Sequence, residues 1–178
     1  MLYTRAGDTG KSGLFGTKER FPKNHPVYEA LGTLDELNSL LGICRVYAAG
    51  IAGEVALEDE IHEAQEVLFI IQAELAGSDM HLDMARVKEI ETVIDTIEAL
   101  SGNPHAFVIA GATKISAFLD YARTVARRAE RTAMTTEVQR TMSDASRAYL
   151  NRLSSLLYAL ARYAASKEGI KEALPSYT

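Results

Sequence analysis

The 178-residue sequence contains a single cysteine, Cys44, so no disulfide can form within the chain. A chain without internal disulfides is typical of a reducing compartment. No apolar stretch approaches the ~18 residues that a membrane span requires. The first residues lead into glycines and charges, which is unlike the apolar run of a signal peptide. These absences predict a cytoplasmic protein with no membrane span.

Positive charge is also scarce, with 19 Lys and Arg against 24 Asp and Glu and a formal net charge of −5 at pH 7. General nucleic-acid binding requires a basic surface, so we expect no nucleic-acid partner. The basic residues nevertheless gather in two segments. Residues 1–26 hold five basic and two acidic side chains, and residues 120–152 hold seven arginines and four acidic side chains. Two cationic segments in an acidic chain favour a local anionic ligand, although solvated helix faces can also carry such runs.

Helical periodicity is what the sequence has in quantity. Apolar residues recur at helical spacing in five segments, which predicts helices over residues 26–49, 54–76, 84–100, 113–134 and 136–167. Asn24 is a candidate N-cap of the first helix, and residues 101–104 (SGNP) end the third. Long helices with short joints predict an all-α fold, a five-helix antiparallel bundle. We expect one domain over residues 1–178, with a leader at 1–26, the bundle at 27–168 and a tail at 169–178.

The leader has no sustained periodicity, because glycines recur at every third position from residue 7 to residue 16. Residues 4–13 offer backbone N–H groups, hydroxyls and cations, which are the parts of a phosphate cradle. Residues 10–12 (GKS) mimic the end of a Walker loop, but the full G-x-x-x-x-G-K-[ST] motif is absent. A flexible terminal arm is the alternative interpretation of this leader.

The predicted fourth helix carries four arginines. Successive residues advance ~100° around an α-helix, so Arg123 and Glu130 fall at the edge of its apolar stripe, where an unpaired charge is costly. Arg127 and Arg131 lie one turn apart on a flank, and two such guanidiniums suit the oxygens of a polyphosphate. Arg128 lies almost opposite the core and is expected to be solvated. A salt-bridged surface helix is the alternative.

A few polar residues interrupt apolar helices, among them Asp35 and Asn151. Asp35 is a natural partner for a semi-buried arginine such as Arg123, although a purely structural pairing is equally consistent with the pattern. A di-iron bundle would need two Glu-x-x-His motifs, and the sequence has none, so a di-iron centre is not expected and the identity of any protein metal ligand stays open. His62 is expected to be an ordinary surface residue, and Cys44 a packed core thiol.

Four motifs occur together, at residues 3–10 (YTRAGDTG), 30–38 (ALGTLDELN), 122–131 (ARTVARRAER) and 150–154 (LNRLS). In this order they resemble the PduO-type ATP:cob(I)alamin adenosyltransferases, and the likeness spans nearly the whole chain. The resemblance implies a ferritin-like five-helix bundle that forms homotrimers with active sites between subunits. It also implies transfer of the 5′-deoxyadenosyl group of ATP to the cobalt of a reduced corrinoid, cob(I)alamin, with adenosylcobalamin and triphosphate as products.

The same resemblance implies that Mg²⁺ enters on the ATP phosphates, and it leaves open a monovalent cation and a partner, either a corrinoid reductase or a B12-dependent acceptor enzyme. It assigns ATP binding to Thr4, Arg5, Ala6, Gly7, Asp8, Ser12, Lys23, Arg127, Glu130, Arg131 and Asn151. It assigns catalytic roles to Asp35, Phe107, Arg123 and Arg127.

Within that set, the resemblance implies that Arg127 and Arg131 hold the phosphates, and that Asp35 and Arg123 form a salt bridge across the subunit interface. Phe107 corresponds to a phenylalanine that packs beside the corrin and helps displace its lower axial ligand. Family members commonly continue as Phe-x-Leu-Pro-Gly-Gly, whereas residues 107–112 read FVIAGA here. This departure concerns the corrin side of the site rather than the ATP side.

The implied reaction agrees with the residue types present. Cob(I)alamin is a strong nucleophile, so the enzyme needs no activating base; its tasks are to position the ribose 5′-carbon, to stabilise leaving-group charge and to lower the coordination number of cobalt. Two other classes of protein remain open from the residues alone: an ATP-sensing bundle that regulates a partner without chemistry, and a purely structural or assembly bundle.

Overall fold

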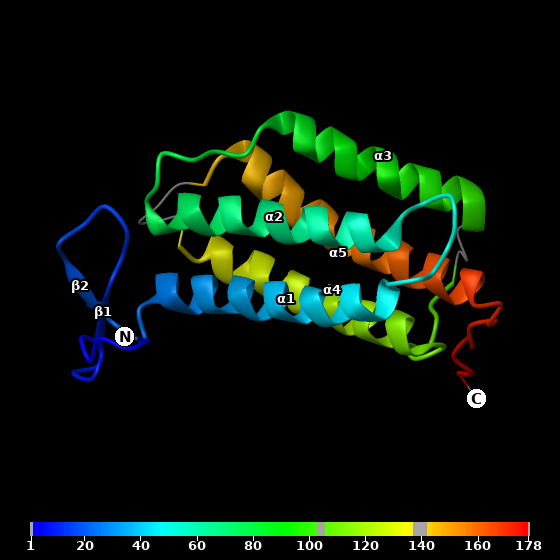
Figure 1. The fold of residues 1–178 in the computed structure, drawn as a ribbon, viewed down its shortest axis with the longest axis horizontal. Coiled ribbons are helices and arrows are strands. Elements are labelled where there is room, and N and C mark those ends of the chain that lie inside the picture. The colour runs from blue at the N-terminus through cyan, green and yellow to red at the C-terminus, as the bar shows by residue number, and fades with distance from the viewer. Residues whose placement is uncertain (1, 103–105, 137–141, 178) are drawn as a thin grey trace.

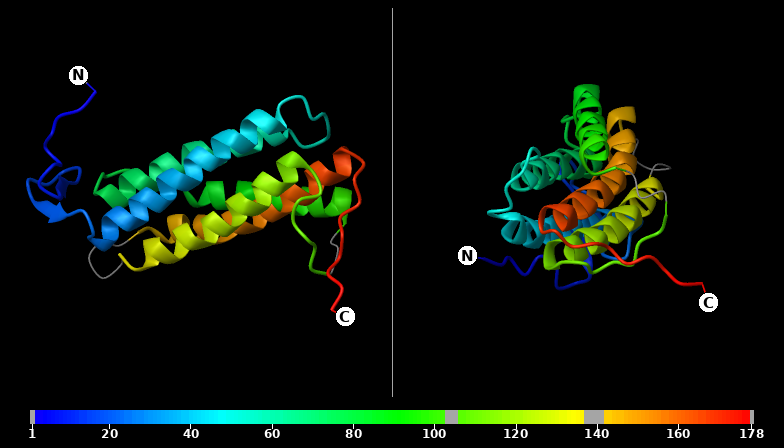
Figure 2. Two further views of the ribbon diagram at one scale, coloured as in Figure 1. Left: turned by 90° about the horizontal axis from the view of Figure 1, so that it is seen from below. Right: turned by 90° about the vertical axis from the view of Figure 1, so that its right-hand side faces the viewer.

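A computed structural model of the chain describes residues 2–102, 106–136 and 142–177. Its elements are β1 (Lys11–Gly13), β2 (Arg20–Pro22), α1 (Pro26–Ala48), α2 (Leu57–Ala76), α3 (Met84–Ser101), α4 (Lys114–Met134) and α5 (Asp144–Lys167). Four helices form a bundle in which α1 packs on α2 and α4, and α5 packs on α4 and α2. The remaining helix, α3, lies along the outer side of α5 (Figure 2). The predicted all-α five-helix bundle is confirmed.

One continuous apolar core runs through the helices. The first helix contributes Leu34, Leu37 and Leu41, all fully buried, at the 3–4-residue spacing that places them on one face. Cys44 follows on the same face as a packed core thiol, as predicted, and burial raises the pKa of its thiol to about 12. Among the described residues, no helix is both long enough and apolar enough to cross a membrane.

Three predicted helix boundaries differ from the structure. The N-cap of α1 is His25, whose side chain accepts a hydrogen bond from the Val27 N–H, so the expectation of Asn24 is wrong. The second helix begins at Leu57 rather than at residue 54. The fifth begins at Asp144, capped by Ser143, rather than at residue 136; Thr136 lies in a turn after α4, and residues 137–141 lie outside the described residues. The predicted stop of the third helix is met at Gly102, while residues 103 and 104 also lie outside them.

The late start of α2 has a tertiary cause. The Tyr163 hydroxyl on α5 accepts a hydrogen bond from the Val55 N–H (3.0 Å) and donates one to Glu54 (3.1 Å). Lys167 also pairs with Glu54. Residues 54 and 55 are therefore held against the end of α5, and their backbone does not continue the helix.

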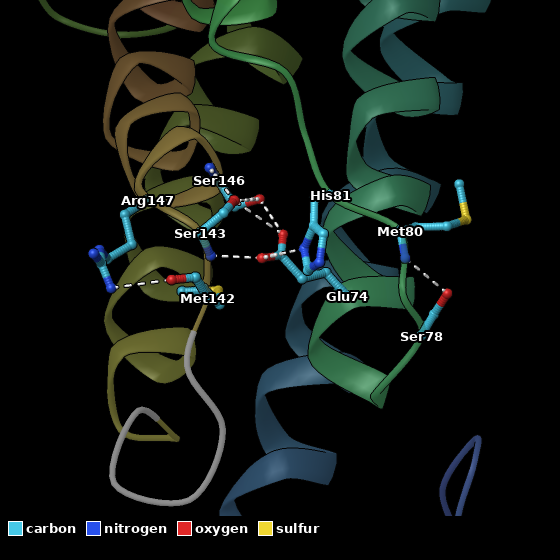
Figure 3. Close-up of polar contacts among 8 residues, drawn as sticks. All are labelled: Glu74, Ser78, Met80, His81, Met142, Ser143, Ser146 and Arg147. Carbon is cyan, nitrogen blue, oxygen red and sulfur yellow. Dashed lines mark hydrogen bonds and ion pairs between the residues drawn. The ribbon is translucent and has the colours of Figure 1, made fainter.

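The start of α5 is fixed by a buried carboxylate on α2 (Figure 3). Glu74 accepts hydrogen bonds from the Ser143 backbone N–H (2.5 Å), the Ser143 hydroxyl (3.3 Å) and the Ser146 hydroxyl (2.5 Å). His81, in the segment before α3, lies 3.4 Å from the same carboxylate. Because Glu74 is only 7% exposed, these donors replace the water that a free carboxylate would keep.

Candidate functional site

The leader folds around a two-stranded antiparallel hairpin at one end of the bundle, beside the start of α1 (Figure 1). Arg20, a residue with no predicted role, organises it: its guanidinium donates hydrogen bonds to the carbonyl oxygens of Ala6 (2.6 Å) and Lys11 (2.8 Å). Arg5 has a φ of 59°, in the left-handed region that non-glycine residues rarely adopt. Such strained backbone is often found where a chain binds a ligand.

Several residues of the predicted ATP set lie close together in this leader. A Cβ atom added at Gly7 would lie 3.0 Å from the Lys23 Nζ, so the glycine leaves room for the ammonium group. The backbone N–H of Lys23 donates to the Gly10 carbonyl (2.9 Å), and Asp8 donates through its N–H to the Arg5 carbonyl (3.2 Å). Residues 5–10 thus turn tightly beside the Lys23 ammonium.

Two more predicted leader residues are placed by local contacts. The Thr4 hydroxyl accepts a hydrogen bond from the Ala6 N–H (3.4 Å). The carbonyl of Ser12 accepts one from the hydroxyl of Tyr28 on α1 (2.5 Å), which joins the hairpin to the bundle. The fold thereby gathers the leader part of the predicted set into one short segment whose side chains are mostly exposed.

On α4, the two arginines predicted to hold phosphates are exposed. Neither Arg127 nor Arg131 has an ion-pair partner among the described residues. Arg128 is exposed, as expected for a residue opposite the core, and it also pairs with Glu36 on α1. An arginine pair without internal counter-ions is available to an external anion, whereas Arg128 is occupied in joining α4 to α1.

The other predicted residues at this end of α4 form a chain of hydrogen bonds between helices. The Asn151 amide on α5 donates to Glu130 on α4 (2.8 Å). Arg152 donates in turn to the Asn151 amide oxygen (2.8 Å) and pairs with Glu91 on α3 (2.9 Å). Glu130 and Asn151 are therefore brought together directly. No hydrogen bond or ion pair joins them, Arg127 or Arg131 to the predicted leader residues in the described part of the chain.

Within one chain, Arg123 pairs with a residue other than Asp35, the partner suggested by the sequence. Its Nε lies 3.6 Å from the Asp120 Oδ1, one turn earlier on α4. Asp120 is buried and its other oxygen accepts a hydrogen bond from Arg162 on α5 (2.5 Å). Asp35 is exposed on α1 and has no ion-pair partner among the described residues. The direct pairing of Asp35 with Arg123 inside one chain is thus replaced by Asp120, because a carboxylate three residues away on the same helix is closer.

A cavity of about 330 Å³ opens between α3, α4 and α5. Arg123 and Arg127 line it from α4, and Arg162 and Tyr158 from α5, with the Arg162 guanidinium 4.7 Å from the Tyr158 ring centroid. Arg162 is only 6% exposed, and its Nη1 has no hydrogen-bond partner among the described residues. Isoleucines at 94 and 97 supply an apolar wall. The cavity therefore combines guanidinium donors with apolar surface, which suits a ligand that has both polar and apolar parts.

The segment between α3 and α4, which includes Phe107, lies at the opposite end of the bundle from the leader (Figure 2). The Phe107 side chain is 79% exposed, so the ring is free of apolar contacts that would bury it within the described part of the chain. The segment is tied to the C-terminal residues, since the Ile109 N–H donates to the Ala173 carbonyl (2.8 Å). Glu172 in that tail pairs with Arg162 (2.6 Å), so the tail also adjoins the cavity.

Four residues that position the site have no role predicted from the sequence: Asp120, Arg162, Arg20 and Tyr28. Asp120 could have been found from its position three residues before Arg123, and Arg162 from its place in an apolar stretch of α5. His62 has an exposed side chain, as predicted, and contacts Arg45. Among the described residues, no three His, Cys, Asp or Glu side chains lie together so as to hold a metal ion.

A family model and individual relatives assign the chain to the same protein family. Residues 2–164 match the model of the cobalamin adenosyltransferases. A corrinoid adenosyltransferase of Citrobacter freundii is 40% identical over 168 residues, covering 90% of this chain and 93% of that protein. The corrinoid adenosyltransferase PduO of Salmonella typhimurium is 38% identical over 168 residues, or 90% of this chain, and the chain spans about half (48%) of the length of that relative.

The fold agrees with the sequence comparison. A variant PduO-type ATP:corrinoid adenosyltransferase from Lactobacillus reuteri, complexed with cobalamin and ATP, matches with a TM-score of 0.92 and 28% identity. The match covers 99% of this chain and 97% of that one. The resemblance stated from the four sequence motifs is confirmed, and the chain belongs to the cobalamin adenosyltransferase family.

Proposed function

We propose that this chain is a corrinoid adenosyltransferase that transfers the 5′-deoxyadenosyl group of ATP to the cobalt of cob(I)alamin. The observation that carries this function is the exposed Arg127 on α4, which has no ion-pair partner among the described residues and lines a partly apolar cavity in a chain of this family. In the reaction a cobalt–carbon bond forms with the electron pair of cobalt, the C5′–oxygen bond breaks, and triphosphate leaves with the bonding pair.

Charge on the leaving triphosphate determines what α4 has to do. As the C5′–oxygen bond breaks, negative charge grows on the phosphate oxygen, and fixed guanidinium donors stabilise that charge more than they stabilise bound ATP. Arg127 and Arg131 fit this role because neither forms an ion pair with a carboxylate in the described part of the chain. Glu130 and Asn151, hydrogen-bonded to each other at 2.8 Å, would hold the two helices in register and place an amide near the nucleotide.

The leader would bind the rest of the ATP molecule. Arg5 and Lys23 supply positive charge, Thr4 and Ser12 supply hydroxyls, and the tight turn over residues 5–10 offers backbone N–H groups. Mg²⁺ would arrive on the ATP phosphates and supply further charge neutralisation there. A monovalent cation is a second candidate ion for the same polyphosphate.

The corrin would lie on the side of the cavity that faces the segment between α3 and α4. Phe107, whose ring is exposed, would pack beside the macrocycle and favour loss of the lower axial ligand. Arg123, held by Asp120, lines the same cavity from α4.

We further propose that the active unit is a homotrimer with each site shared by two subunits. Among the described residues, no hydrogen bond or ion pair joins the leader to the arginines of α4 within one chain, so a neighbouring subunit would supply one of the two halves. The exposed face of α1 carries Asp35 together with the apolar Ile43 and Val46, which suits contact with another copy. Asp35 would then reach the partner subunit's arginine equivalent to Arg123.

The domain organisation and cellular setting follow as proposals from the same reaction. Residues 1–26, 27–168 and 169–178 would act as one domain, because Tyr28 joins the leader to the bundle and Glu172 joins the tail to Arg162 on α5. A cytoplasmic location would supply ATP and the reducing conditions that cob(I)alamin requires. A corrinoid reductase would deliver the substrate, or a B12-dependent enzyme would accept the product.

The test is to incubate the purified protein with Mg-ATP and chemically reduced cobalamin under anaerobic conditions. We expect adenosylcobalamin, detected by its absorption spectrum, to form in a 1:1 ratio with triphosphate. Absence of both products would refute the transferase assignment. Thermal stabilisation by Mg-ATP without products would instead support an ATP-sensing bundle, and no stabilisation at all a structural one.

A further inference from the structure

A second cavity, of about 420 Å³, lies between α2, α3 and α5 and shares no lining residue with the first. The proposed transferase reaction makes no use of it. One wall is charged and the other is apolar. The lining residues are Asp59, Glu60, Glu63, Arg86, Glu89, Ile90, Val93, Tyr149 and Leu156.

The charged wall holds four carboxylates and one guanidinium, which leaves an excess of negative charge. Arg86 pairs with Glu63 (2.6 Å) and with Glu89 (3.1 Å). Asp59 and Glu60, in the first turn of α2, have no ion-pair partner among the described residues. Burial, followed by the charges of Glu63 and Asp59, raises the pKa of the half-buried Glu60. The cavity therefore lacks a counter-charge at this end.

A buried phenol points to a ligand rather than to a solvated acidic surface. Tyr149 on α5 is only 3% exposed, lines the cavity, and lies within electrostatic reach of Glu60, Glu63 and Glu89. Its hydroxyl has no hydrogen-bond partner in the described part of the chain. The ring is buried but the hydroxyl oxygen is not sealed from the cavity, so a donor or acceptor that enters the cavity would meet it there.

The character of the walls decides the class of ligand. Nowhere in the described residues do three metal-binding side chains converge, so these carboxylates do not form a ready-made cage for a metal ion. Ile90, Val93 and Leu156 form an apolar wall that a metal ion would leave unused. A chain of methylene groups would cover that wall, while ammonium groups would meet the carboxylates.

We propose that this cavity binds a short aliphatic polyamine. Its ammonium groups pair with Asp59 and Glu60, its methylene chain lies against Ile90, Val93 and Leu156, and the Tyr149 hydroxyl accepts a hydrogen bond from a ligand N–H. Arg86 is already an internal cation in the same cavity, and it shows that the carboxylates can hold a nitrogen donor at 2.6 Å.

The experiment is calorimetric titration of the full-length protein with spermidine at low ionic strength. We expect one saturable site per chain. Glu60→Gln should weaken binding about tenfold, because it removes a charge-assisted contact inside the cavity. Tyr149→Phe should weaken it several-fold with little change of shape. Glu58→Gln is the matched control: it removes the same charge from the same turn of α2 outside the cavity, and binding should stay within about twofold.

Three results would overturn the proposal. The first is the absence of saturable binding of spermidine to the wild-type protein. The second is an equal loss of affinity in Glu58→Gln and Glu60→Gln, which would indicate non-specific attraction to an acidic surface. The third is binding of Mg²⁺ alone that depends on Glu60 while spermidine does not bind, which would make this a metal site. Circular dichroism of each variant verifies that it is folded, and Tyr149→Phe gives an independent answer if Glu60→Gln is not.

Discussion

Arg123 and Arg127 lie one turn apart on α4, yet their electrostatic surroundings differ. Arg123 is half-buried and lies beside Asp120, which also pairs with the buried Arg162. Arg127 is exposed and has no internal partner in the described chain. A guanidinium that is already paired gains less from a phosphate than one that is free. Of these two arginines, Arg127 should therefore stabilise the negative charge of the leaving triphosphate more strongly.

Replacing Arg127 with alanine should lower turnover by ~10²-fold or more, the typical cost of losing one preorganised charge contact in the transition state. The fold should remain intact because the side chain is exposed. Arg127→Lys should retain part of the activity, since it keeps the charge but loses the planar fork. The measurement is the rate of adenosylcobalamin formation at saturating ATP.

The control for this series is Lys88→Ala, which removes an exposed cation from α3, away from the proposed site. Its turnover should match that of the wild type. An Arg127→Ala enzyme that keeps its turnover within about twofold would refute the proposed role of Arg127 in holding the phosphates, because one preorganised contact is worth far more than that.

Asp120 should matter chiefly for stability. It is buried and lies beside two arginines, so Asp120→Asn would remove one of the two carboxylates, the other being Glu172, that pair with the buried Arg162 guanidinium. Breaking a buried ion pair in this way typically costs about 3–5 kcal/mol. Urea unfolding of the wild type and the variant, compared at equal m values, measures the difference. A loss below ~1 kcal/mol would mean that water reaches the Arg162 guanidinium.

Single-residue roles were predictable where a motif carried them, and less so where a tertiary contact did. The angular position of Arg123 correctly indicated that it needs a partner. The partner itself, Asp120, depends on Arg162 approaching from α5, which no local pattern reveals. The pairing of the exposed Arg128 with Glu36 was not predictable, because the two residues lie 92 positions apart in sequence. Periodicity gives the face of a helix, but it does not give what that face meets.

Among the elements, the start of α5 depends on a side chain of α2. Glu74 accepts the hydrogen bonds that cap the helix at Ser143 and Ser146 (Figure 3). Glu74→Gln would put an amide donor where an acceptor is needed and should cost about 1–3 kcal/mol in the free energy of unfolding. Hydrogen exchange of the first turn of α5 should speed up first.

The matched control is Glu66→Gln on the same helix, because that side chain is 62% exposed. Its free energy of unfolding should change by less than about 0.5 kcal/mol. Equal effects of the two substitutions would show that the loss comes from the net charge of α2 rather than from the cap of α5.

The joint between α1 and α2 should respond to acid. Hydrogen bonding from Lys167, with smaller contributions from a backbone N–H and Tyr163, lowers the pKa of Glu54 from 4.5 to about 2. A carboxyl whose pKa is lower in the folded chain stabilises the fold above its unfolded pKa, and that contribution is lost as pH falls from 4.5 towards 2.

Glu54→Gln should therefore lower the melting temperature at pH 7, and the difference from the wild type should shrink as the pH falls through this window. Added salt should also reduce the difference, since the pair is at the surface. Melting curves in a series of buffers from pH 7 downwards test both statements. A difference that is constant with pH would show that the charge of Glu54 is not what stabilises the joint.

Helices of 18 or more residues were predictable from apolar spacing, because each buries a continuous stripe in one core. The two three-residue strands were not, since their pairing is supported by the Arg20 side chain rather than by an alternating pattern. The starts of α2 and α5 were placed too early for the same reason. Tyr163 and Glu74 end or begin those helices from other parts of the chain.

At the scale of the whole molecule, one face of α1 has more exposed apolar surface than a solitary bundle needs. Val46 is 73% exposed, and Ile43 and Tyr47 lie near it. Val46→Glu should disrupt the proposed homotrimer, because a charge would have to be desolvated at each contact. Size-exclusion chromatography with light scattering should show a trimer for the wild type and smaller species for the variant, with unchanged helical content. A wild-type monomer that is active would refute the shared-site proposal.

Asp35→Asn tests the proposed contact between subunits more gently. It removes one charge without a change of size, and the residue has no ion-pair partner within its own described chain. We expect a weaker trimer or weaker corrinoid binding, with an unchanged melting temperature at concentrations where the protein is monomeric. Unchanged assembly together with unchanged kinetics would contradict the pairing of Asp35 with the partner subunit's arginine.

The hydrogen bond from Ile109 to Ala173 couples the last residues of the chain to the segment that carries Phe107. The opposite terminus is the hairpin proposed to bind ATP (Figure 1). Neither terminus is therefore a neutral place for a purification handle or a fluorescent fusion: one added at the front would crowd the nucleotide, and one added at the back would pull on the corrin side. A label is better attached to a cysteine introduced by the substitution Lys88→Cys, at an exposed position of α3. The native Cys44 is buried and should stay unmodified.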